Sequence, residues 1–286
     1  MNYKTSCVIV NYNDWKRTEK LVETIYNYDI ITHIIVVDNC STDDSEKYLS
    51  IISGEKYIFI QTGFNGGYGY GNNKGINKAI ELEDEYILIV NPDVVFDEQC
   101  VRHMIQLINN DKSCGIVGAK EEYIGNNGWK YTSSTKDVLT TSLFLNKIFK
   151  WRYYDDSYFQ EKGKVQVDVI PGCFLLTRVD YITEAGLYDE NIFLYEEEKV
   201  LYKKYSELGL YSMVDLDVSY EHRHKSDSSQ SIQKNVLNKK TLIRSKMYFL
   251  KKYRHFNHVQ LILSALFFKC CILEMIVYTL LRKLLR

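Results

Sequence analysis

The first third of the chain alternates between short apolar runs and segments with helical periodicity, and this alternation restricts the possible folds more than any other feature. We expect strands at residues 7–10, 34–37, 57–61 and 86–90, with helices at 15–28, 41–52 and 72–81. Ser41 or Thr42 is the expected cap of the second helix. Strands separated by helices of this length predict an α/β fold, with a mostly parallel sheet that helices cover on both faces.

Polar residues follow each expected strand. Right-handed crossovers place the loops after parallel strands along one edge of the sheet, where α/β proteins bind ligands. The candidate ligand residues on these loops are Asn11, Asn13, Asp38, Asn39, residues 65–73, Asn91 and Asp93. A carboxylate such as that of Asp38 can accept a hydrogen bond from a base or from a ribose hydroxyl, although an aspartate there more often begins a turn.

A glycine-rich segment, residues 65–75, leads into the third expected helix. Glycines let the backbone approach a ligand closely, and a helix N-terminus suits an anion. The segment lacks the Gly-Lys-Ser/Thr ending of an ATPase phosphate loop and the spacing of a dinucleotide fingerprint. It is therefore either a ligand-binding loop of another kind or a flexible connection.

The segment Asn91-Pro92-Asp93 follows the apolar run Tyr86–Val90. Asp93, at the end of a buried strand, can hold a hard divalent cation that neutralises a diphosphate. His222 and His224 share one side of a strand if the strand expected at 214–220 continues through them. Either imidazole could join Asp93 on the metal, although two histidines are too few for a closed zinc site.

Three consecutive glutamates, Glu196, Glu197 and Glu198, lie in a segment that we expect to be helical from 191 to 208. Successive helix residues point about 100° apart, so the three carboxylates cannot all face one site. One or two of them could reach a cleft and act as a general base for a bound hydroxyl. The alternative is a solvated acidic turn at a helix N-terminus.

The composition argues against some classes of protein. A formal net charge of −1 speaks against a partner as acidic as nucleic acid. The 7 cysteines show no metal-ligand spacing, which indicates reduced thiols and a cytoplasmic setting. The N-terminus carries no secretion signal pattern, so we expect no export.

Residues 231–286 read as a helical extension that follows a first domain of residues 1–230. Residues 259–281 are apolar and long enough to cross a bilayer. Lys269 and Glu274, however, would each cost roughly 2.5–3.5 kcal/mol at the membrane centre.

We therefore expect residues 259–281 to form an amphipathic helix that lies in the cytoplasmic leaflet of a membrane, where flanking basic residues meet anionic lipid. The polar side of this helix is the narrow arc of Gln260, Ser264, Glu274 and Arg282. Packing on the first domain, or on a second copy in a homodimer, is the alternative.

In their order and spacing these segments resemble the family 2 glycosyltransferases of the GT-A fold, and most of all the bacterial rhamnosyltransferase-like branch. The resemblance covers residues 6–229. The matching segments are 8–13 (VIVNYN), 36–43 (VVDNCSTD), 65–75, 88–94 (LIVNPDV), 171–178 (PGCFLLTR), 186–190 (GLYDE) and 193–198 (FLYEEE).

The resemblance implies a set of binding residues. Asn11, Asn13 and Asp38 would hold the base and ribose of a nucleotide sugar. The residues of the glycine-rich segment that would line its pocket are Asn65, Gly67, Gly71 and Asn72, and Gly172 would border the sugar and the acceptor. Asp93, in the second position of the family's Asp-x-Asp motif, would ligate Mg²⁺ or Mn²⁺ together with His222 or His224, while Asn91 replaces the first aspartate.

The resemblance also implies a reaction. The family's Glu-Asp pair falls on Glu197 and Glu198, so Glu198 takes the position of the base with one extra methylene, and Glu197 is the alternative. The implied enzyme is inverting and metal-dependent. It would move a sugar from dTDP-rhamnose or a UDP-hexose to a hydroxyl of a growing, lipid-linked surface polysaccharide, on the inner face of the bacterial cell membrane.

Two other functions stay open. Asn91 and Glu198 leave room for a weakly active or inactive GT-A scaffold that recruits polysaccharide-assembly enzymes to the membrane. A sugar-phosphate nucleotidylyltransferase shares the nucleotide-binding topology, but such enzymes have a basic glycine-rich loop after the first strand. This chain has Asn11-Tyr12-Asn13-Asp14 there.

Overall fold

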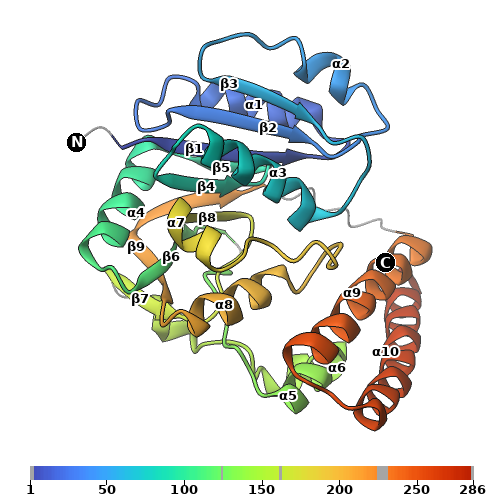
Figure 1. Ribbon diagram of the computed structural model, residues 1–286. Helices are drawn as coiled ribbons and strands as arrows, with labels where there is room; N and C mark the ends of the chain where they lie inside the picture. Colours follow the sequence, from blue (N-terminus) through green and yellow to red (C-terminus); the bar gives the residue numbers. More distant parts are fainter. Residues whose placement is uncertain (1–2, 124, 161–162, 224–230, 285–286) are drawn as a thin grey trace.

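The computed structural model describes residues 3–123, 125–160, 163–223 and 231–284. One continuous sheet runs through the molecule in the order β3-β2-β1-β4-β8-β6-β9-β5, with β7 paired to β9. Helices cover the sheet on both sides, and a pair of long helices lies beside it (Figure 1). The α/β fold that the alternation of strands and helices predicts is confirmed.

The first half of the sheet is parallel. Its strands are β1 (Thr5–Asn11), β2 (His33–Asp38), β3 (Tyr57–Gln61) and β4 (Tyr86–Val90). Asn11 pairs with Asp38, and Asp38 pairs with Gln61. The polar residues that follow the apolar runs therefore meet along the carboxyl edge of the sheet, as the sequence predicts.

The second half of the sheet is mixed, which departs from the expected mostly parallel arrangement. β8 (Phe174–Arg178) runs antiparallel to β4 and to β6 (Cys114–Glu121), and β9 (Tyr211–His222) runs parallel to β6. β5 (Val94–Phe96) and β7 (Lys164–Val167) pair antiparallel with β9. After β4 the turn at 91–93 leads directly into β5, which pairs with the last residues of β9 and not with β4.

Apolar layers fill both faces of the sheet. One layer joins Ile9 and Val36 to α1 (Trp15–Ile25), α2 (Ser45–Leu49) and α4 (Glu98–Asn110). The other joins Val8 and Ile35 to α3 (Tyr68–Glu81), α7 (Val179–Glu184) and α8 (Glu197–Glu207). Successive strand residues alternate between the two layers, so strands buried on both faces need continuous apolar runs.

Three helices begin at residues other than those predicted. The helix expected at 191–208 is wrong in its first part, because Tyr195 and Glu196 adopt left-handed backbone angles (φ 71° and 72°) and α8 begins only after them. α2 is also shorter than predicted: Ser41 bonds to Asp38 instead of capping the helix, and the N-cap is Asp44. α3 begins earlier than predicted, so most of the glycine-rich segment is helical.

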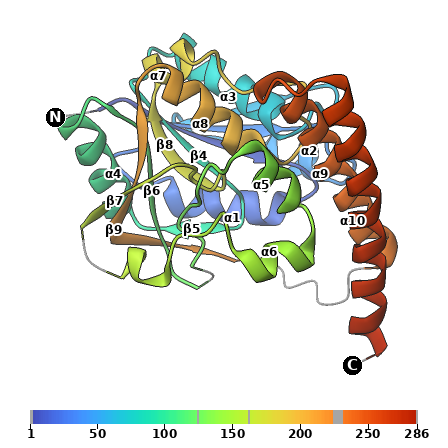
Figure 2. The same cartoon turned by 90° about the horizontal axis from the view of Figure 1, so that it is seen from below.

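The C-terminal extension is a hairpin of α9 (Ile232–Tyr253) and α10 (His258–Leu284), seen from two sides in Figures 1 and 2. Leu250 and Phe268 are buried against each other near the turn, and Asn235 donates a hydrogen bond to Thr279 (3.3 Å) near the open end. Within the described residues, α10 is the one helix long and apolar enough to cross a membrane, and 17% of its apolar window is buried.

Between β6 and β7 the chain forms α5 (Ser134–Leu139), α6 (Leu143–Phe149) and a 3₁₀ turn, η1 (Asp156–Phe159). In Figure 2, α6 lies beside α10.

Candidate active site

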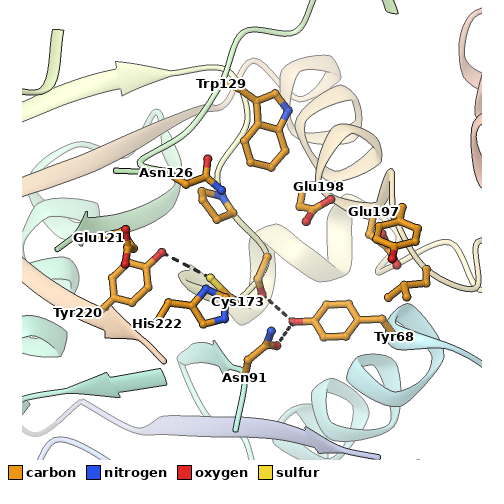
Figure 3. Close-up of a pocket in the computed structure, with 14 residues that line it drawn as sticks. Tyr68, Asn91, Glu121, Asn126, Trp129, Cys173, Glu197, Glu198, Tyr220 and His222 are labelled. Atoms are coloured by element: carbon orange, nitrogen blue, oxygen red, sulfur yellow. Dashed lines mark hydrogen bonds between the residues drawn. The ribbon is translucent and has the colours of Figure 1, made fainter. Parts of the chain in front are cut away.

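A pocket of about 420 Å³ opens at the carboxyl edge of the sheet (Figure 3). Its walls come from the ends of β4 and β9, the loop before β8, and the beginnings of α3 and α8. The predicted site residues that line it are Asn91, Gly172, Glu197, Glu198 and His222. The fold therefore gathers into one cavity residues from widely separated parts of the sequence.

Tyr68, at the start of α3, connects three walls of the pocket. Its hydroxyl group lies 2.6 Å from the carbonyl oxygen of Gly172 and 3.0 Å from Oδ1 of Asn91, and it donates to these acceptors (Figure 3). Burial raises the pKa of the Tyr68 hydroxyl well above its ordinary value, so this group stays a donor. Sequence reasoning missed Tyr68, although an aromatic hydroxyl inside a glycine-rich helix start was the available signal.

Asp93 and His222 form a pair between β5 and β9. Oδ1 of Asp93 lies 3.1 Å from Nε2 of His222, because antiparallel pairing places Val94 opposite His222. Burial lowers the pKa of His222, but hydrogen bonds with Asp93 and Cys173 outweigh it and raise that pKa to about 10. His222 lines the pocket, whereas Asp93 borders an adjacent hollow and lies 3.7 Å from Arg17.

This pair fits a divalent cation that a substrate helps to hold. A carboxylate oxygen suits Mg²⁺ and Mn²⁺, and the imidazole of His222 could ligate Mn²⁺ once it loses the proton that it shares with Asp93. No cluster of three or more His, Cys, Asp or Glu side chains that could hold a metal occurs in the described residues. Diphosphate oxygens and water would complete the coordination, as is usual for Mg²⁺. His224 lies outside the described residues.

The three consecutive glutamates point to two different places. Glu196 turns away from the pocket and contacts Nζ of Lys199 (2.9 Å) and Nζ of Lys246 (3.1 Å). Glu197 and Glu198, which we call the glutamate pair, line the pocket (Figure 3). Glu198 lies beside Gly172, where an added Cβ would come within 3.2 Å of its Oε1.

Burial and mutual repulsion affect both members of the glutamate pair. Burial, and then the charge of Glu198, raise the pKa of Glu197 well above that of an ordinary glutamate. Oε1 of Glu197 is buried and has no hydrogen-bond partner among the described residues. Burial also raises the pKa of Glu198, but backbone hydrogen bonds, one of them from Gly172, oppose the shift. Each carboxyl group of the pair is therefore harder to ionise than that of an ordinary glutamate.

Asp38 is buried inside a closed hydrogen-bond network. Its carboxylate accepts from Nδ2 of Asn11 (2.7 Å), Nε2 of Gln61 (2.9 Å), and both Oγ (2.5 Å) and the backbone N–H (3.2 Å) of Ser41. These bonds occupy the acceptor positions of both oxygens. Asn13 acts on the same loop, because its Oδ1 accepts from the N–H of Thr42 (2.7 Å). A nucleotide would bind Asp38 directly only if one of these bonds opened.

The predicted residues of the glycine-rich segment lie outside the lining of the pocket. Oδ1 of Asn65 accepts from the N–H of Gly67 (3.0 Å), and Nδ2 of Asn72 donates to the carbonyl of Tyr68 (3.0 Å). A Cβ at Gly71 would press against Val10, so this glycine lets α3 approach β1 closely. All four residues shape the start of α3, which in turn positions Tyr68.

The loop that precedes the glutamate pair is fixed by α9. Ser245 donates to the carbonyl of Leu194 (2.7 Å), and the carboxylate of Asp189 accepts from Lys252 (2.8 Å) and Tyr253 (2.6 Å). Although burial alone would raise it, these two donors hold the pKa of Asp189 well below its usual range.

A buried ion cluster extends this brace. Asp137 of α5 lies 2.5 Å from Nζ of Lys199 and 3.2 Å from Nζ of Lys246, and both lysines also contact Glu196. The two lysines hold the pKa of Asp137 well below its usual range, against the opposing effect of burial. Side chains of helices α5, α8 and α9 thus meet around Glu196, the residue directly before the glutamate pair.

Further residues of the pocket carried no recognisable signal in the sequence. Glu121, Trp129, Cys173 and Tyr220 line it, and Nε1 of Trp129 is buried without a partner among the described residues. The hydroxyl of Tyr220 lies 3.5 Å from Sγ of Cys173 (Figure 3). Each of these residue types is common in cores, so only the tertiary structure identifies them.

The fold is that of the GT-A glycosyltransferases. The crystal structure of GalNAc-T7 with UDP, GalNAc and Mn²⁺ matches it with a TM-score of 0.61, at 11% identity, over 86% of this chain and 48% of that one. The family model Glycosyl transferase family 2 matches residues 6–183. The chain belongs to glycosyl transferase family 2.

Two curated relatives are similar to about two thirds of this chain. Low-salt glycan biosynthesis hexosyltransferase Agl10 of Haloferax volcanii is 31% identical over 197 residues, which are 68% of this chain and 58% of that protein. This chain thus spans less than two thirds of the length of Agl10. Rhamnosyltransferase WbbL of Escherichia coli (strain K12) is 24% identical over 204 residues, which are 67% of this chain and 72% of WbbL.

Proposed function

We propose that this protein is an inverting, metal-dependent glycosyltransferase that moves a sugar from a nucleotide diphosphate to a hydroxyl group of a glycan. The observation that carries this proposal is the position of the glutamate pair. Glu198 lies beside Gly172, in the same pocket as Asn91 and His222. A base and the residues that would hold a diphosphate thus share one cavity.

In the proposed reaction Glu198 accepts the proton of the acceptor hydroxyl, because its carboxylate lies beside Gly172 in the pocket and takes the position of the family's base. The acceptor oxygen forms a bond to the anomeric carbon as the bond to the diphosphate oxygen breaks on the opposite face, which inverts the anomeric configuration. A divalent cation bound near Asp93 and His222 would stabilise the charge that develops on the leaving diphosphate. Tyr68 holds Gly172 and Asn91 in place around the reacting groups.

The donor is proposed to be dTDP-rhamnose or a UDP-hexose. WbbL is a rhamnosyltransferase and Agl10 a hexosyltransferase, and both are distant relatives.

The acceptor is proposed to be a lipid-linked glycan at the inner face of the bacterial cell membrane, reached through α10. One side of α10 exposes a row of apolar side chains: Val259, Ile262, Leu263, Leu266, Leu273, Val277, Leu280 and Leu281. The other side packs on α9. Ser264 and Glu274, from the polar arc expected to face water, are turned toward the protein.

The contacts of α10 favour a helix that lies on the membrane over one that crosses it. Asn235 and Leu250 hold α9 along α10 at both ends of the hairpin. A crossing α10 would have to separate from α9 or carry it along. The basic residues of α9 are Lys234, Lys239, Lys240, Arg244, Lys246, Lys251 and Lys252. Each would be costly within the bilayer.

The first test is a thermal-shift panel with UDP, dTDP and GDP and their sugars, with and without Mn²⁺, followed by donor turnover for wild type and Glu198→Gln. Stabilisation by one nucleotide that Mn²⁺ increases, with turnover lost in Glu198→Gln, is the expected result. Binding without turnover in the wild type would favour the recruiting scaffold. The absence of any nucleotide shift would count against a donor site.

Membrane binding is tested separately with phosphatidylglycerol and phosphatidylcholine vesicles. Leu266→Glu combined with Leu273→Glu should reduce sedimentation with phosphatidylglycerol vesicles strongly, while Ile51→Glu, at a still more exposed apolar position after α2, should not. Equal binding of the two variants would contradict the proposed surface. Concentration-dependent dimers that are lost in the α10 variant would identify a homodimer interface instead.

A further inference from the structure

A larger cavity, of about 1100 Å³, lies next to the candidate active site. It is lined by the chain from Gly125 to Phe159, including α6. Asn126 lines both cavities, and the guanidinium of Arg152 lies 5.1 Å from the ring centre of Trp129, a residue of the smaller pocket. We call this larger cavity the basic cleft.

The lining of the basic cleft is strongly cationic. Its cationic side chains are Lys130, Lys136, Lys147, Lys150 and Arg152. Among the described residues that line it, Asp155 is the one acidic side chain. Within the described residues none of the five cations forms an ion pair with a carboxylate. Nε of Arg152 is buried there without a hydrogen-bond partner. In a chain whose net charge is −1, this local excess indicates an anionic ligand.

Aromatic rings lie among these cations. Phe149 and Trp151 stack with their ring centres 4.4 Å apart, and Tyr153, Tyr154 and Phe159 also line the cleft. Tyr and Trp rings combine apolar faces with polar edges, which suits a saccharide. The ligand is therefore expected to carry both an anionic group and a sugar.

The wall of the cleft formed by α6 reaches an apolar surface. Phe144, Ile148 and Phe149 are 65%, 55% and 49% exposed. Glu274 of α10 accepts hydrogen bonds from the N–H groups of Leu143 (3.0 Å) and Phe144 (2.6 Å), which fixes α6 to α10 (Figure 2). The exposed side chains of α6 and α10 thus belong to neighbouring helices, of which α6 lines the cleft.

We propose that the basic cleft binds the phosphate or diphosphate linker of a lipid-linked saccharide. This inference rests on the proposed transferase function and specifies its acceptor. The lipid lies along α6 and α10, Lys136, Lys147 and Lys150 contact the linker, and the saccharide extends past Asn126 toward Glu198. Lysine and arginine bind phosphate through charge-assisted hydrogen bonds, so three lysines give a site that is strong and salt-sensitive.

The test compares wild type with a cleft variant, Lys136→Gln/Lys147→Gln/Lys150→Gln, and with a control variant, Lys4→Gln/Lys112→Gln/Lys164→Gln. The control removes the same charge from exposed lysines outside the cleft. The probes are farnesyl diphosphate, farnesol and inorganic diphosphate, measured by calorimetry without divalent metal so that no metal can hold the diphosphate at Asp93. Nucleotide binding with Mn²⁺ is measured on all three proteins.

Wild type and the control variant should bind farnesyl diphosphate more tightly than either fragment probe, and the cleft variant should bind it at least about tenfold more weakly. Nucleotide binding should stay equal in all three proteins.

Equal farnesyl diphosphate affinity in the cleft variant would overturn the inference. So would inorganic diphosphate binding as tight as that of farnesyl diphosphate, which would indicate a free-anion site. A cleft variant that loses only phosphatidylglycerol vesicle binding would overturn it in favour of lipid headgroups. If the wild type itself does not bind any nucleotide in the presence of Mn²⁺, the proposed transferase function is refuted instead.

Discussion

Nζ of Lys246 on α9 lies 3.1 Å from the carboxylate of Glu196, the residue directly before the glutamate pair. Both side chains are buried, at 5% and 4% exposure, and Lys246 also contacts Asp137. Lys246 belongs to the C-terminal extension, yet it contacts the N-cap residue of α8, the helix that carries the proposed base.

Lys246→Ala should therefore reduce both stability and turnover. Removing one partner of a buried ion pair costs about 3–5 kcal/mol, because the other charge stays buried. We expect a lower Tm and a lower kcat with a smaller change in donor affinity. Lys251→Ala, an exposed lysine of the same helix, is the control in thermal unfolding and kinetic assays. Equal Tm and kcat for the two variants would show that the contact has no such effect.

Glu198→Gln should lower kcat by about 10²–10⁴-fold and leave nucleotide affinity nearly unchanged, since general-base catalysis contributes this much to the transition state alone. Glu198→Asp should keep substantial activity, whereas Glu197→Gln should cost less than Glu198→Gln. A larger loss of kcat in Glu197→Gln than in Glu198→Gln would identify Glu197 as the general base instead.

The pH dependence of turnover follows from the same residue. Glu198 acts in its ionised form, and burial raises its pKa above the ordinary 4.5. The rate should therefore fall as the pH drops through a midpoint above 4.5, measured as kcat against pH at saturating donor. A midpoint at or below 4.5 would contradict the assignment.

Glu197→Gln should stabilise the protein at neutral pH. The pKa of Glu197 is raised in the fold, so its favourable contribution to stability is complete below its ordinary pKa and is lost as the pH rises through the folded value. Glutamine stays neutral throughout. The Tm difference from wild type should be positive at pH 8, at about 2–4 °C per kcal/mol, and small at pH 4.5. Glu207→Gln, an exposed position, should show no such trend.

Gly67→Ala should be more destabilising than Gly63→Ala. Both glycines have positive φ, at 94° and 74°, so both substitutions strain the backbone. A Cβ at Gly67 would overlap the carbonyl oxygen of Phe193, whereas a Cβ at Gly63 would meet open space. Chemical unfolding should separate the two by about 1–3 kcal/mol, the usual cost of overpacking. Equal losses of unfolding free energy in the two variants would mean that the backbone at Phe193 can move away from the added Cβ.

The parallel half of the sheet could be predicted because its strands are buried on both faces and therefore read as unbroken apolar runs. Tyr57–Gln61 and Tyr86–Val90 were predicted at their observed bounds. The polar residues after these runs fall on one edge for topological reasons, which made Asn91 recognisable as a site candidate. The glutamate pair was identified instead from the run of three glutamates and from the family resemblance.

The missed features depend on contacts that no local pattern encodes. The start of α8 was misplaced because Tyr195 and Glu196 adopt positive φ, which these residue types rarely do without tertiary support. Tyr68 was missed because its acceptor, the carbonyl of Gly172, is 104 residues away. The segment around α6 has neither helical nor strand periodicity of useful length, so the basic cleft has no sequence signature.

The brace between α9 and the loop before the glutamate pair has a consequence for biosynthesis. A nascent chain that ends near residue 230 already contains every strand of the sheet, but it lacks the donors that α9 contributes to Asp189 and Glu196. Lys199 of α8 alone would then pair with Glu196, so we expect the turn before the glutamate pair to be fixed only after α9 has emerged from the ribosome and docked. The proposed base would therefore reach its final position well after the sheet that surrounds it has been synthesised.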